Sequence, residues 1–78
     1  MTDLYPAADQ RELLRQAATA HTTASAEVEA FLRRMPEVPG PADVTEYADL
    51  LSREERARAD RQAAADAAGL RLPSLESE

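Results

Sequence analysis

One short stretch divides the chain in two: Pro36-Glu37-Val38-Pro39-Gly40-Pro41. Proline fixes its own φ angle, cannot donate a backbone hydrogen bond, and disfavours the helical conformation in the residue before it. Three prolines in this stretch of six residues therefore predict a stiff turn. On both sides the chain is rich in Ala, Leu, Glu, Arg and Gln, which favour helices, and it has no alternating β-branched run. We expect a single small domain over residues 1–78, an all-α hairpin of two long helices.

The segment before the turn should be helical from about residue 6 to residue 35. Pro6 suits the first position of a helix, and Arg33 and Arg34 fall in the last turn, near the negative end of the helix dipole. Apolar residues recur there at alternating steps of three and four, which indicates a seam that needs a partner helix. The seam consists of Leu14, Ala17, His21, Ala24, Val28, Phe31 or Leu32, and Met35.

The segment after the elbow at residues 36–42 should be helical from about residue 43 to residue 68. We expect Asp43 to be its N-cap, with Glu46 three residues later in a capping box. Its first apolar face consists of Val44, Tyr47, Ala48 and Leu51, and a second stripe consists of Leu50, Ala57, Ala64 and Ala68.

This change of face leaves two interpretations of the second segment. Either one helix changes its contacts along its length, or a third helix begins at Ser52, where a Ser-x-x-Glu box ends at Glu55. The spacing of Glu54 and Arg58, which favours an ion pair on one helix, indicates a continuous helix. Gly69 then suits the left-handed position that ends a helix.

Composition disfavours most classes of chemical site. The chain has no cysteine and one histidine, so we expect neither a disulfide nor a metal site. Its two glycines lie far apart and cannot form a phosphate-binding loop, so we expect no cofactor. Catalysis needs a nucleophile, a base and an orienting group in a pocket, and two helices alone do not enclose one. We therefore expect a protein that is not an enzyme.

Charge and hydropathy narrow the choice of partners. Fifteen acidic against nine basic residues give a net charge of −6, which repels nucleic-acid backbones. No apolar run reaches the roughly 20 residues of a membrane span, and no signal peptide is visible, so we expect a cytoplasmic protein that binds neither nucleic acid nor membranes. All nine bases are arginine, and Lys, Ile and Asn are absent, so we expect a GC-rich, bacterial genome.

His21 allows two interpretations because it is the one side chain with an ordinary pKa near neutrality. It could act as a pH switch, or meet its symmetry mate in a dimer. Alternatively, it lies at the rim of the seam and forms a hydrogen bond with a neighbouring carboxylate or hydroxyl group. We favour the second interpretation.

These observations predict a small non-enzymatic protein-interaction protein: an adaptor, regulator or accessory subunit. One hairpin covers only part of its seam, so we expect a homodimer that forms a four-helix bundle, a larger protein partner, or both. One alternative is an acidic inhibitor, antitoxin-like or phage-type, which uses the acid-only stretch 36–51 against a basic or nucleic-acid-binding surface. A further alternative is a small subunit that completes an enzyme. The expected contact residues are Leu14, His21, Val28, Phe31, Leu32, Met35, Tyr47 and Leu51 in the seam, and Leu70, Leu72 and Leu75 in the tail.

The tail at residues 69–78 generates the first testable prediction. Its three leucines could bury about 300 Å² of apolar surface. Burial stabilises by roughly 25 cal/mol per Å², before the entropy cost of ordering the tail is subtracted. If the tail docks on its own hairpin, as we expect, truncation after Gly69 lowers the melting temperature. If it binds a partner instead, truncation leaves melting unchanged and abolishes partner recovery. A truncated chain with unchanged melting and unchanged partner recovery would contradict both roles.

Overall fold

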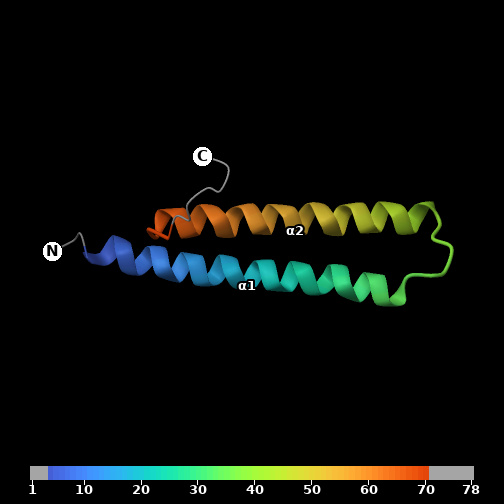
Figure 1. Cartoon of the computed structure of the whole chain (residues 1–78), viewed down its shortest axis with the longest axis horizontal. Coiled ribbons are helices and arrows are strands. Elements are labelled where there is room, and N and C mark those ends of the chain that lie inside the picture. The colour runs from blue at the N-terminus through green and yellow to red at the C-terminus, as the bar shows by residue number, and fades with distance from the viewer. Residues whose placement is uncertain (1–3, 71–78) are drawn as a thin grey trace, which may run out of the picture.

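Two antiparallel helices form the whole of the described fold (Figure 1). The structure is a computed structural model that describes residues 4–70, with side chains from residue 9 onward. Helix α1 spans Leu4–Arg34 and helix α2 spans Pro41–Ala67. Between residues 4 and 70 there is no strand, so the expected all-α hairpin of two long helices is confirmed.

The start of α2 differs from the prediction. The N-cap is Gly40, not Asp43, and Pro41 occupies the first position of the helix. Proline suits that position because its φ is already fixed near the helical value. An N–H at that position would have no partner within the helix, so proline loses no hydrogen bond there. Asp43 lies one turn further in, where its carboxylate accepts a hydrogen bond of 2.8 Å from the Gly40 amide. The prediction of Asp43 as N-cap is therefore wrong, although its side chain does form a hydrogen bond with the N-cap residue.

Helix α2 runs through Ser52 without a break and ends at Ala67. The interpretation with a third helix at Ser52 is wrong for this part of the chain. Gly69 adopts a left-handed φ of 90°. The Leu70 amide donates to the Ala65 carbonyl at 2.8 Å and the Gly69 amide donates to Asp66 at 3.0 Å. These two bonds form a Schellman motif, which explains why the helix ends at the glycine.

The core is a narrow seam between α1 and α2. Three side chains are buried in it: Ala24, Phe31 and Leu50. The Phe31 ring is only 1% exposed and stacks on Tyr47, with 5.7 Å between the ring centroids. The Arg34 guanidinium lies 5.1 Å from the Phe31 ring centroid, at cation–π distance. The elbow end of the hairpin is therefore its best-packed part.

The facing side of α2 differs from the predicted stripes. Val44 is 61% exposed and Ala48 is also exposed, so these two do not face α1. The residues turned toward α1 follow alternating steps of three and four: Tyr47, Leu50, Glu54 and Ala57. One regular stripe thus combines Tyr47 of the first predicted face with Leu50 and Ala57 of the second, and Glu54, which belonged to neither, lies between them.

Phe31 generates a prediction about stability. Replacing it with alanine removes the most buried ring and leaves a cavity, so Phe31→Ala should lower the free energy of unfolding by about 3 kcal/mol or more. Leu13 lies on the same helix and is 54% exposed, so Leu13→Ala should change that free energy by less than about 0.5 kcal/mol. Urea denaturation followed by circular dichroism measures both. Equal losses in the two variants would contradict the core described here.

Candidate functional site

Ion pairs bridge the two helices along one side of the seam. Arg34 pairs with Glu46 at 2.7 Å, and Arg53 pairs with Glu27 at 3.3 Å. The α1 members of these pairs are seven residues apart, and so are the α2 members. Seven residues make two helical turns, so both pairs lie on the same side of the hairpin. We call this side the ion-pair face.

Two hollows lie along the other side of the seam. On α1, Leu14 lines one hollow and Leu32 lines the other, a step of eighteen residues or five helical turns. On α2, Tyr47 lines one hollow and Ala65 lines the other, at the same step of eighteen residues. Residues at such steps share one side of a helix, so both hollows open on the same side of the hairpin. We call this side the open face.

The elbow hollow, at one end of the open face, has a volume of about 240 Å³. Its floor is the stacked pair Phe31 and Tyr47, and its walls include Leu32, Met35 and Val44. Leu32 is 46% exposed and Met35 is 38% exposed. The hollow therefore offers a rigid aromatic floor and accessible aliphatic walls, which suit an apolar side chain from another protein.

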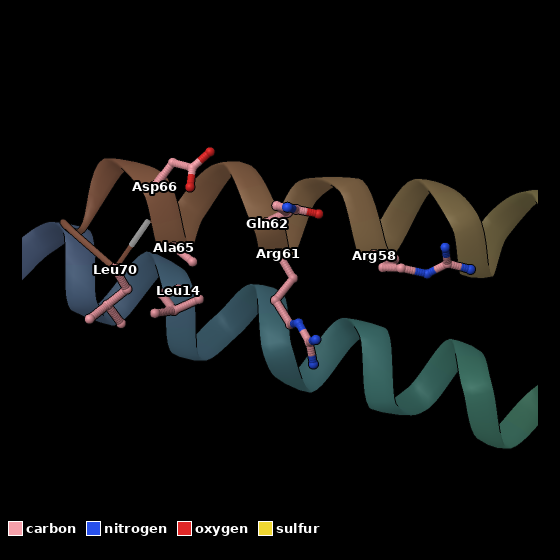
Figure 2. A pocket seen from close by; sticks show the side chains of 7 residues that line it. All are labelled: Leu14, Arg58, Arg61, Gln62, Ala65, Asp66 and Leu70. Carbon is pink, nitrogen blue, oxygen red and sulfur yellow. The ribbon is translucent and has the colours of Figure 1, made fainter. Parts of the chain in front are cut away.

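The open-end hollow, at the other end of this face, also measures about 240 Å³ and combines apolar and cationic walls (Figure 2). Leu14, Ala65 and Leu70 supply the apolar part. The Arg61 side chain reaches from α2 toward α1, whereas the Asp66 carboxylate points away from α1 (Figure 2). Together with Arg58, Arg61 gives this hollow a positive lining that the elbow hollow lacks.

A polar cluster separates the two hollows at the middle of the seam. His21 Nε2 lies 2.8 Å from Glu54 Oε2, and the two side chains are 15% and 16% exposed. The other carboxylate oxygen of Glu54 accepts a hydrogen bond of 3.1 Å from Arg58. Two hydrogen bonds hold the pKa of Glu54 below its ordinary value. The bond with His21 is the larger cause, and the bond from Arg58 is the second. The interpretation of His21 as bonded to a carboxylate is confirmed.

Sequence reasoning missed Glu54 as a member of the seam. It assigned Glu54 only to an ion pair with Arg58 along α2, a contact that also forms. The available signal was spacing, because Glu54 follows Tyr47 by seven residues and therefore lies on the same side of α2.

The predicted contact residues fall into four groups. Phe31 is buried, while Leu14, His21, Val28, Tyr47 and Leu51 are half-buried along the seam. Leu32 and Met35 are exposed at the elbow hollow, and Leu70 is exposed at the open-end hollow. Leu72 and Leu75 lie outside the described residues. The helical part of the contact set thus borders the seam and the open face.

Two kinds of feature are absent from residues 4–70, the part of the chain that the structure describes. Within them, no three His, Asp or Glu side chains lie close enough together to hold a metal ion. Neither of the two described helices has an apolar stretch long enough to cross a membrane.

Glu54 generates a prediction about acid stability. Its pKa is lowered in the folded chain, so its ionised form stabilises the fold above its ordinary pKa of 4.5, and that stability is lost as pH falls through the lowered value. Glu54→Gln removes this contribution, so wild type should exceed the variant in stability by more at pH of about 6 than at pH of about 3. Thermal melting at both values measures the difference. The exposed neighbour Glu55 supplies the control, Glu55→Gln, and an equal pH response in the two variants would contradict the assignment.

Comparison of the chain with known protein families, curated proteins and solved structures finds no match.

Proposed function

We propose that the chain is a small non-enzymatic interaction protein that presents its open face to another helical surface. The observation that carries this proposal is the difference between the two sides of the seam. Interhelical ion pairs cross one side, and the other side has two hollows with exposed apolar walls. A helix that packed on the open face would complete the burial of a seam that the hairpin only half covers.

The elbow hollow supplies the apolar part of this contact. Fully burying a leucine or valine side chain contributes about 1.5–3 kcal/mol, and Leu32 and Val44 are both accessible. The floor needs no rearrangement, because Phe31 and Tyr47 already stack on each other in the hairpin. Such pre-organisation reduces the entropy lost on binding. A partner helix would recognise the hollow with apolar side chains three or four residues apart.

The acid-rich elbow supports a second proposal, an acidic inhibitor. Residues 36–51 contain four acids and no base. Two of these acids are engaged within the chain: Asp43 with the Gly40 amide and Glu46 with Arg34. Glu37 and Asp49 are exposed and add to the negative field. Binding through this field would weaken steeply with salt, whereas apolar docking on the open face would not.

A third proposal, a small subunit that completes an enzyme, would use the same open face. It differs from the first only in the identity of the partner.

A matched set of variants tests the leading proposal. The double variant Leu32→Gln/Val44→Gln removes two apolar walls of the elbow hollow without adding charge. Leu13→Gln makes the same kind of change at an exposed leucine that lines neither hollow. Each tagged chain is used to recover partners from cells of its source, including untagged copies of itself, at about 0.05 and 0.5 M salt.

Wild type and Leu13→Gln should retain the partner at both salt concentrations, and the double variant should lose it at both. A partner that binds all three chains equally would contradict a role for the open face. A partner released from wild type by salt alone would favour the acidic inhibitor.

A further inference from the structure

We propose that the partner on the open face is a second copy of this chain, packed antiparallel so that each elbow hollow lies over the other copy's open-end hollow. This inference rests on the proposed function, because it assumes that the open face is the contact surface. It adds the occupant and the orientation. The result is a four-helix bundle with a two-fold axis that crosses the middle of both hairpins.

Surface area is the first argument for a second copy. A compact monomer of 8.5 kDa exposes about 4,700 Å². The whole chain exposes 6208 Å², and its shortest extent is only 16 Å, because two helices form a single layer. A standard interface covers about 800 Å² on each partner, and the excess of about 1,500 Å² is larger than that.

Charge is the second argument, and it selects the orientation. The elbow half of the described hairpin, residues 22–51, carries six acids and two arginines, a net charge of −4. The other half, residues 9–21 and 52–70, carries six acids and six arginines and is neutral. Stacking elbow on elbow would bring two negative halves together. The antiparallel arrangement instead places each negative elbow over a hollow lined by Arg58 and Arg61.

The positions of the hollows locate the two-fold axis. On α1, the midpoint between Leu14 and Leu32 falls at the level of residue 23, between His21 and Ser25. On α2, the midpoint between the two hollows falls at Glu54. The axis therefore passes beside the polar cluster, and the two copies of Ser25 lie on either side of it, about one helical turn apart along the helices. A central polar layer of this kind commonly fixes the register of a helical bundle.

Cysteine cross-linking tests this arrangement directly, because the full-length chain contains no cysteine. Ser25→Cys is nearly isosteric and places a thiol beside the proposed axis. Thr23→Cys is the matched control, since residue 23 lies two positions away on the far side of α1 and is exposed. Under mild oxidation Ser25→Cys should form a disulfide-linked dimer at least tenfold faster than Thr23→Cys. Light scattering of the wild-type chain at about 100 μM should give twice the 8.5 kDa chain mass.

A charge reversal at one position tests the orientation. Val44 lies at the elbow hollow, so in the antiparallel dimer Val44→Arg meets Arg58 and Arg61, whereas Val44→Glu meets opposite charge. Val44→Arg should therefore raise the dimer dissociation constant at least tenfold more than Val44→Glu. The reverse order would indicate elbow-on-elbow packing and overturn the inference.

Two other results would also overturn it. One is a wild-type chain that stays at 8.5 kDa under these conditions. The same holds for a chain that dimerises only after truncation at Leu70, because the chain's own residues 71–78 then occupy the open-end hollow. The other is cross-linking of Thr23→Cys in preference to Ser25→Cys. A monomer that binds a different protein, and loses it in Leu32→Gln/Val44→Gln, would leave the proposed function standing while this inference fails.

Discussion

The hydrogen bond between His21 and Glu54 is the constraint on which the arrangement of the two helices depends. Much of the remaining seam is alanine, including Ala17, Ala24 and Ala57, and small side chains interlock weakly. The alanines by themselves oppose a slide along the helix axis only weakly. A slide would move His21 and Glu54 apart, which leaves the half-buried His21 without its partner and Glu54 with Arg58 alone; such a loss costs more than the bond itself contributes. The polar pair therefore selects one register.

That register determines which side of the hairpin is closed. With His21 opposite Glu54, the same antiparallel alignment brings Glu27 to Arg53 and Arg34 to Glu46 on one side. It also stacks Phe31 on Tyr47 and leaves Leu32 and Val44 at the rim of the elbow hollow. The ion-pair face and the open face are therefore two results of one alignment. The exposed pairs contribute little stability, but they show which side of the seam is occupied.

Much of the fold follows from local chemistry in the sequence. The prolines of the elbow divide the chain, Gly69 ends α2, and the spacing from Leu14 to Phe31 identifies the facing side of α1. The cap of α2 was harder to assign, because Asp43 suits an N-cap by residue type while Pro41 suits the first helical position two residues earlier. Local preference alone does not rank these two signals.

The candidate site was less predictable, because it depends on contacts between residues far apart in the chain. Glu54 resembles any exposed acid of a charged helix until His21, 33 residues earlier, is known to lie opposite it. Phe31 and Leu32 are neighbours in sequence, yet one is buried and the other is 46% exposed. Which of them faces α2 is decided by the register, not by hydropathy. The same is true of the difference between the ion-pair face and the open face.

A double-mutant cycle on His21 and Glu54 tests the central claim most directly. His21→Ala, Glu54→Ala and the double variant are unfolded in urea at pH of about 7, and their free energies of unfolding are compared with wild type. If the pair sets the register, each single variant loses stability, and the double variant loses clearly less than the two single losses added together. Additive losses would show that the two side chains do not interact in the folded chain and would contradict the account.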